Sequence, residues 1–215
     1  MTEPRSSGGG RVLTVAAWTV LVLGLWLWGR EITDVRPGGG AGQAGAMAPA
    51  GLPAAHAPLG PALPKRVDVP SMGIRAPLIP RGLDGDGAIE PPPFDRPGTV
   101  GWWGGGTRPG EAGAALLVGH VDTASKPAVF YGLSTAKPGD KVRVARTDGT
   151  VAEFTVEDVQ VYERRSFDAH KAYGPKVPGR AELRLVTCGG TYDKAAEEYT
   201  ANVVVSAYLT GTARS

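Results

Sequence analysis

The chain has 215 residues, a formal net charge of +2 and a single cysteine. Its 23 basic and 21 acidic residues are scattered, which argues against the concentrated basic face of a nucleic-acid-binding protein. One cysteine cannot form an internal disulfide, so it is either a small buried hydrophobic residue or a candidate reactive thiol.

The N-terminal part of the chain contains a candidate membrane span. Val12 to Gly29 is an uncharged run of 18 residues, rich in Leu, Val and Trp, between Arg11 and Arg30. As a helix it would extend about 27 Å, close to the hydrocarbon thickness of a bilayer. Arg5 and Arg11 precede the run, whereas the charges after it cancel, so the positive-inside rule keeps residues 1–11 in the cytoplasm. We therefore predict a single-pass cell-membrane protein whose folded domain is extracytoplasmic.

A cleaved signal peptide is the alternative interpretation of this run. The small residues Ala44-Gly45-Ala46 resemble a cleavage site, but they lie about fifteen residues beyond the run. The run is also long for the core of a signal peptide. We favour an uncleaved transmembrane anchor over residues 12–29.

The segment that follows has the composition of a tether. From residue 37 onward it is mostly Gly, Ala and Pro, with little charge and no hydrophobic periodicity. Such a segment cannot bury enough apolar surface to offset its ordering entropy, so we predict a disordered linker over residues 30–64. Residues 65–215 are then expected to form one domain with its own core.

Short β-prone runs separated by turn residues make up this domain. Strands are expected at residues 66–69, 76–79, 114–118, 141–144, 151–156, 159–162, 183–187 and 202–208. Thr147-Asp148-Gly149 predicts a hairpin turn, and the nearest helical candidates, 126–133 and 193–199, are short. The pattern is typical of an all-β sandwich or barrel, and we predict a closed barrel of about eight strands with short helical turns.

Cys188 lies at the end of an apolar run and is followed by Gly189 and Gly190. The two glycines allow a sharp turn and the close approach of another backbone. A thiol at such a strand end is accessible and rigidly held, as nucleophiles usually are. From this stretch alone, the nucleophile and the buried filler are equally good interpretations.

His120 has the same placement, directly after an apolar run and Gly119. A histidine that titrates near neutrality can take a proton from a thiol or stabilise a thiolate beside it. Asp122 could orient the ring or could equally cap a local turn. His170, in a loop-like stretch, is the weaker candidate.

The same residues narrow the reaction class. One cysteine and scattered histidines have no zinc-ligand spacing, so we predict no metal. Gly104-Gly105-Gly106 lacks the Lys-Ser/Thr of a phosphate-binding loop, and we predict no cofactor. Cys188 and His120 together favour covalent catalysis, in which a thiolate attacks an acyl carbon. That reaction also needs donors for the developing oxyanion.

Arg184 is the candidate donor. It precedes Cys188 by two strand alternations, so the two side chains share a face of the sheet with Cα atoms about 13 Å apart. At that distance Arg184 would reach towards the thiol or line a substrate groove. The alternative is a solvated arginine on a strand.

Several ordered motifs of the folded part resemble the sortase family, most closely its class F members. These motifs are Gly101-Trp102-Trp103, Pro109-Gly110, Gly119-His120-Val121-Asp122, Pro127-Ala128-Val129-Phe130, Leu183-Arg184-Leu185-Val186-Thr187-Cys188-Gly189-Gly190 and Asn202-Val203-Val204-Val205. They extend over about residues 70–209, which is essentially the whole folded part.

The resemblance implies an eight-stranded sortase barrel at the outer face of a Gram-positive membrane. It implies a cysteine transpeptidase that cleaves a Leu-Pro-x-Thr-Gly-like sorting signal between Thr and Gly. The acyl group would pass through a thioester on Cys188 to an amine of a cell-wall precursor, and His120 would protonate the leaving amine. Val186, Thr187 and Asn202 would bind substrate. The expected partners are thus the sorting-signal peptide of exported proteins, the amine, and the membrane through residues 12–29.

The arginine departs from the family pattern. Many sortases carry it about twelve or thirteen residues after the cysteine, where this chain has Thr200 and Ala201. Either Arg184 takes this role, or backbone N–H groups and Asn202 donate instead. Two other functions stay open: a cysteine hydrolase of the same fold, because water can intercept the thioester, and a non-catalytic envelope domain that only binds.

Overall fold

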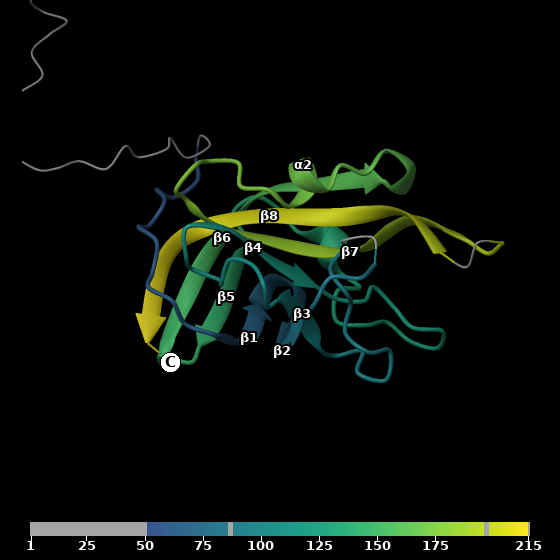
Figure 1. The fold of residues 1–215 in the computed structure, drawn as a ribbon, viewed down its shortest axis with the longest axis horizontal. Coiled ribbons are helices and arrows are strands. Elements are labelled where there is room, and N and C mark those ends of the chain that lie inside the picture. The colour runs from purple at the N-terminus through teal and green to yellow at the C-terminus, as the bar shows by residue number, and fades with distance from the viewer. Residues whose placement is uncertain (1–50, 86–87, 196–197, 215) are drawn as a thin grey trace, which may run out of the picture. The chain divides into compact units, whose positions relative to one another are not determined.

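The computed structural model describes residues 51–85, 88–195 and 198–214. Within these ranges eight strands close into a barrel in the order β1-β2-β3-β4-β7-β8-β6-β5 (Figure 1). The strands are β1 Pro64–Val69, β2 Ile74–Arg81, β3 Val100–Trp103, β4 Gly113–Val118, β5 Lys141–Arg146, β6 Thr150–Glu163, β7 Ala181–Asp193 and β8 Glu198–Arg214. The all-β closed barrel predicted from the sequence is confirmed.

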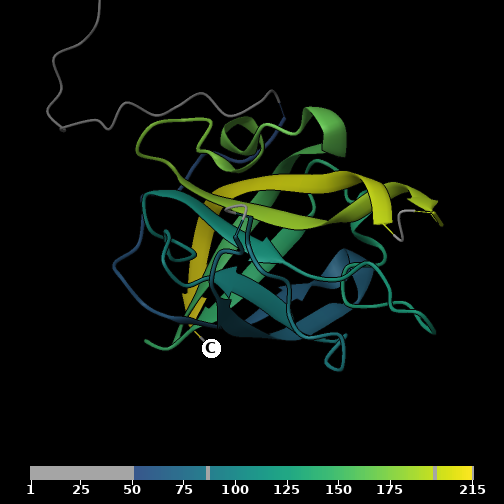
Figure 2. The same ribbon diagram turned by 45° about the vertical axis from the view of Figure 1, so that its right-hand side comes forward.

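The described helices are short. Three 3-10 turns cover Pro70–Met72, Leu133–Thr135 and Arg164–Ser166, and helix α2 covers Ala169–Tyr173. The Asp168 side chain caps α2 by accepting two backbone N–H groups of its first turn. Figures 1 and 2 show α2 outside the barrel, beside β8.

The structure differs from the sequence-based elements in several places, and β3 is not among the expected strands. Residues 193–199, a helical candidate, contain the facing ends of β7 and β8 instead, where Tyr192 pairs with Tyr199. The two strands expected at 151–156 and 159–162 form the single strand β6. A register shift between Val156 and Asp158 lets β6 continue along β8 as one bent strand.

Pairing in the barrel is mostly antiparallel, but β2–β3 and β4–β7 are parallel. The β4–β7 pair matters most for function, because its last paired residues, Val118 and Val186, each lie two residues before a predicted catalytic residue. Parallel neighbours run in the same direction, so His120 and Cys188 follow at the same end of the pair.

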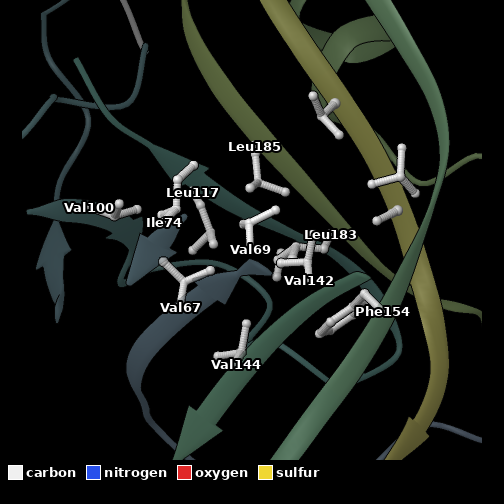
Figure 3. Close-up of a cluster of buried hydrophobic side chains, with 14 of the residues drawn as sticks. Val67, Val69, Ile74, Val100, Leu117, Val142, Val144, Phe154, Leu183 and Leu185 are labelled. Atoms are coloured by element: carbon white, nitrogen blue, oxygen red, sulfur yellow. The ribbon is translucent and has the colours of Figure 1, made fainter. Parts of the chain in front are cut away.

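The barrel interior forms the main hydrophobic core. Alternate residues of the strands point inward and are almost completely buried, among them Leu117, Phe154, Leu183 and Leu185 (Figure 3). Burying each such side chain stabilises the fold by about 1.5–3 kcal/mol. A second, smaller cluster lies on the opposite face of β4, β7 and β8 and contains Ile89, Leu116, Val118, Ala172, Val186 and Val204.

Residues 51–63, which we name the strap, lie along the barrel although their composition predicts part of a linker. The Leu59 N–H donates to the carbonyl of Gly110 at 2.8 Å, and the Tyr208 hydroxyl donates to the carbonyl of Pro53 at 2.6 Å. Leu59 also packs against the main core. These contacts offset the ordering entropy of the strap, so the folded domain begins before residue 65.

The predicted anchor at residues 12–29, with its flanking tail and the first part of the linker, lies outside the described residues. In the part of the chain that the structure describes, no helix is both long and apolar enough to cross a membrane.

Candidate active site

The parallel strands β4 and β7 bring His120 and Cys188 together. Gly119 continues the pairing past the end of β4, because its N–H donates to the carbonyl of Val186 at 3.1 Å. Its own carbonyl accepts the hydroxyl of Thr187 at 2.8 Å. His120 therefore reaches the level of Cys188 on a neighbouring backbone, and neighbouring backbones in a sheet lie about 4.8 Å apart.

Strand alternation places both side chains on the outer face of the sheet. Leu185 points into the main core, whereas Val118 and Val186 belong to the outer cluster. Two residues further along each strand, His120 and Cys188 follow on the same outer face. The register therefore brings an imidazole and a thiol to one face of the sheet, as general acid–base catalysis requires.

The imidazole of His120 is enclosed by a proline-rich segment. Its Nε2 lies 2.6 Å from the carbonyl oxygen of Pro92, and its ring stacks on Phe94 with centroids 4.2 Å apart. A carbonyl oxygen only accepts, so Nε2 carries the proton in this contact. His120 is 8% exposed, whereas Phe94 is 69% exposed, so the stacked phenylalanine forms the outer cover of the histidine.

Cys188 is partly exposed on β7, and its position depends on the glycines after it. Gly190 has φ 77°, in the left-handed region that other residues rarely adopt. A Cβ on Gly189 would lie 2.6 Å from the side chain of Val203 on β8. The expected close approach of another strand is therefore present, but the expected strand end and sharp turn after Cys188 are not. Residues 189–193 continue β7, and a register shift between Gly189 and Tyr192 takes the place of the turn.

Two tyrosines that the sequence analysis did not single out lie near the thiol. Burial raises the pKa of Tyr173 to about 12, with further contributions from the charges of Cys188 and Asp84. A hydrogen bond to Asp122 raises the pKa of Tyr199 to about 12, with smaller effects of burial, the Asp122 charge and the Cys188 charge. The Tyr199 hydroxyl donates to the Asp122 carboxylate, which therefore has a partner other than the His120 ring.

Arg184 lies on the same outer face but is completely buried, with 0% exposure. Its guanidinium donates to the Glu182 carboxylate at 2.5 Å and to the Gly174 carbonyl at 2.7 Å. A third contact runs to the carbonyl of Leu183 at 3.3 Å. The sequence predicts that this side chain reaches towards the thiol, lines a substrate groove or lies in solvent. Its burial excludes the solvated alternative, and Glu182 directs the guanidinium towards the segment after α2.

The predicted substrate-binding residues occupy different environments. Val186 and Thr187 are buried, at 4% and 3% exposure, and Thr187 uses its hydroxyl to join β7 to Gly119. Asn202 is the partner of Cys188 across β7 and β8 and is partly exposed. His170 is exposed on α2, away from the β4 and β7 strand ends.

A cavity of about 150 Å³ opens on the outer face of β4. Its lining is apolar and comes from four elements: β3, β4, the loop after β2 and the end of α2. The lining residues are Leu83, Ile89, Trp103, Ala114, Leu116 and Tyr173. The cavity is large enough for one aliphatic side chain.

The described ranges contain no cluster of side chains suited to bind a metal ion. Among residues 51–85, 88–195 and 198–214, no group of three or more His, Cys, Asp or Glu side chains is arranged to hold an ion.

Comparison with known proteins agrees with this geometry. The described barrel is similar to sortase C-1 from Actinomyces oris, with a TM-score of 0.52 and 22% identity over 68% of this chain and 73% of that one. Sortase A from Listeria monocytogenes matches with a TM-score of 0.52 and 18% identity over 72% of this chain and 92% of that one. A lid mutant of sortase A from Corynebacterium diphtheriae matches with a TM-score of 0.52 and 18% identity over 70% and 71%.

These structural matches show a shared fold. No curated protein matches the sequence significantly. The family model for the sortase domain, however, matches residues 67–210, which include His120 and Cys188. The chain therefore belongs to the sortase family of cysteine transpeptidases.

Proposed function

We propose that this chain is a class F-type sortase in which Cys188 is the nucleophile and His120 the general acid and base. The observation that carries the proposal is the parallel register of β4 and β7, which sets the thiol and the imidazole at one level on one face. The class F assignment rests on the motifs around Trp102, His120 and Cys188.

The outer cavity supports a substrate with an apolar side chain before the cleaved bond. Leu116 lines the cavity and precedes His120 by four residues, which is about 13 Å along a strand. An extended peptide lying along this face would place a residue three or four positions before the cleaved bond in the cavity. The leucine of a Leu-Pro-x-Thr-Gly signal occupies such a position.

The proposed reaction has two halves. The Cys188 thiolate attacks the threonine carbonyl carbon, the carbon–nitrogen bond to glycine breaks, and His120 gives its proton to the leaving amine. An incoming amine then attacks the thioester, the carbon–sulfur bond breaks, and the amine proton passes to His120. The thiolate and the imidazolium are thereby restored, and a new amide replaces the old one.

We propose that residues 12–29 anchor this activity at the outer face of the cell membrane, because the run is long enough to span and the preceding arginines favour a cytoplasmic N-terminus. Fractionation of the native host tests this: the protein should stay with membranes after salt or alkaline washing. An N-terminus found after Ala46, with the protein in the medium, would contradict the anchor.

The enzymatic proposal is tested with a Leu-Pro-x-Thr-Gly peptide, with and without a glycine oligomer as the amine. Intact mass spectrometry should show an acyl adduct on Cys188, and the amine should convert it to the ligated peptide. Hydrolysed peptide alone at every amine concentration would favour the cysteine hydrolase. Failure of Cys188 to form an adduct or to react with an electrophilic thiol probe at neutral pH would favour a binding domain.

A further inference from the structure

The segment after α2 begins beside the outer cavity. Tyr173, the last residue of α2, lines the cavity together with Leu116 and packs against Phe167, with ring centroids 5.3 Å apart. Residues 174–180 continue from Tyr173 to the start of β7, where the Arg180 carbonyl accepts the Gly113 N–H of β4 at 2.9 Å. Contacts that fix the first residues of this segment therefore also restrain Tyr173 at the cavity.

Two buried side chains of β7 hold the segment through its backbone. The Glu182 carboxylate accepts the N–H groups of Lys176 and Val177, both at 2.9 Å. The Arg184 guanidinium donates to the carbonyl of Gly174 at 2.7 Å. Glu182 and Arg184 also pair with each other at 2.5 Å, and both are 0% exposed.

These contacts fix the orientation of the segment as well as its distance from β7. A buried charge is costly unless its hydrogen bonds are satisfied, so the segment must present those three backbone groups to Glu182 and Arg184. An apolar pair on β7 would bury as much surface but would accept the segment in several positions. Gly174 directly follows Tyr173, so a fixed Gly174 carbonyl leaves the tyrosine ring little freedom to move.

We infer that Arg184, together with Glu182, is a positioning residue that holds Tyr173 against the outer cavity, and that Tyr173 contacts the apolar side chain of the peptide bound there. The inference rests on the proposed function for its substrate. It gives the buried arginine a task in substrate recognition that does not require contact with the reacting atoms. The planar fork of arginine suits this task, because one end binds the carboxylate while the other binds the carbonyl.

Arg146 supplies a matched control. It is also a buried arginine, with 2% exposure, and it pairs with a carboxylate, that of Asp148 at 3.5 Å. Its guanidinium likewise donates to a backbone carbonyl, that of Gly60 in the strap. Arg146→Lys should therefore cost stability in the same way as Arg184→Lys while leaving the cavity wall in place.

The first measurement is hydrogen–deuterium exchange on the full chain. In Arg184→Lys the amides of Lys176 and Val177 should exchange at least tenfold faster than in the parent. In Arg146→Lys their exchange should stay within about twofold, although the melting temperature falls in both variants. Unchanged exchange in Arg184→Lys would overturn the inference, because the arginine would not be holding the segment.

The second measurement compares peptides with Leu or Ala at the position expected in the cavity. Arg184→Lys should raise the KM for the Leu peptide about tenfold, keep kcat within about threefold and remove most of the preference for Leu. Tyr173→Ala should do the same, and the double variant should be no worse than Tyr173→Ala, because both act through one ring. A loss confined to kcat, or fully additive effects, would overturn the inference.

The two failures are distinguishable. If the parent turns over no such peptide, the proposed substrate is wrong, and alkylation of Cys188 by iodoacetamide then decides the positioning role. Arg184→Lys and Tyr173→Ala should each speed alkylation several-fold, because the ring beside the thiol has moved, and Arg146→Lys should not. Equal alkylation in all four proteins would overturn the inference.

Discussion

The two faces of β7 are both buried, but they are buried by different means. On the inner face Leu183 and Leu185 pack among aliphatic side chains from the whole barrel, and any well-packed apolar neighbour serves. On the outer face Glu182 and Arg184 are equally inaccessible but need particular donors and acceptors from residues 174–180. The inner face therefore stabilises the fold, whereas the outer face fixes the position of residues 174–180. The candidate active site lies on this outer face.

The largest expected effect comes from Cys188→Ala, which changes the outer face without touching the inner one. Product formation should be abolished, because no other thiol exists in the chain to form the thioester. Thermal unfolding should be nearly unchanged, since the sulfur is partly exposed and lies outside both hydrophobic clusters. Substantial residual turnover in a peptide-cleavage assay would show that the nucleophile is another group.

His120→Ala should lower the rate by about 10² to 10⁴, the usual range for loss of a general acid and base. A Phe94→Ala variant is the control, because it removes only the stacked cover of the ring. If His120→Ala turns over like the parent, the histidine has a structural role under Pro92 and Phe94.

Leu185→Ala should disturb the packing on the inner face of β7 and leave the outer face intact. Removing a completely buried leucine from a closed core costs about 2–5 kcal/mol, so urea unfolding should shift to markedly lower concentrations. The KM for peptide should stay close to the parent value at temperatures where the variant is folded, because the outer cavity has no contact with this side chain. A large KM change without destabilisation would contradict the separation of the two faces.

Glu182→Gln should have the smallest effect, and one that depends on pH. Burial alone would raise the pKa of Glu182, but the Lys176 N–H and the Arg184 guanidinium outweigh it and hold the pKa below its ordinary 4.5. A depressed carboxyl pKa stabilises the fold above about 4.5, and this contribution is lost as the pH falls through the folded value.

Urea unfolding at pH 7 and at pH 3.5 measures this dependence. Glu182→Gln should be less stable than the parent at pH 7, and the difference should narrow at the lower pH. If the parent and Glu182→Gln differ in stability by the same amount at both pH values, the negative charge of Glu182 contributes nothing to stability.

The comparison of faces also explains what the sequence could predict. Alternating apolar residues identify the inner face of strands such as β5 and β7, and the apolar runs and glycines beside Cys188 and His120 select these two residues as candidates. β3 was missed because Gly101 interrupts the pattern and its tryptophans have no alternation. The partners of Arg184 were missed because Glu182 and the Gly174 carbonyl reach it through a segment without regular structure. Tyr173 was missed for the same reason, since its place beside the cavity depends on that segment.

The parallel pairing of β4 and β7 has a consequence for when reactivity appears during folding. The Thr187–Gly119 bond joins positions 68 residues apart, and β5 and β6 lie between them in the chain. Contacts of such long sequence separation close late, because the loop entropy must be offset by structure already formed. A partly folded chain therefore carries a cysteine without its histidine, and the nucleophile becomes competent only when the barrel is complete. In a refolding experiment, acylation of Cys188 by a peptide substrate should consequently lag behind the appearance of β-sheet circular dichroism.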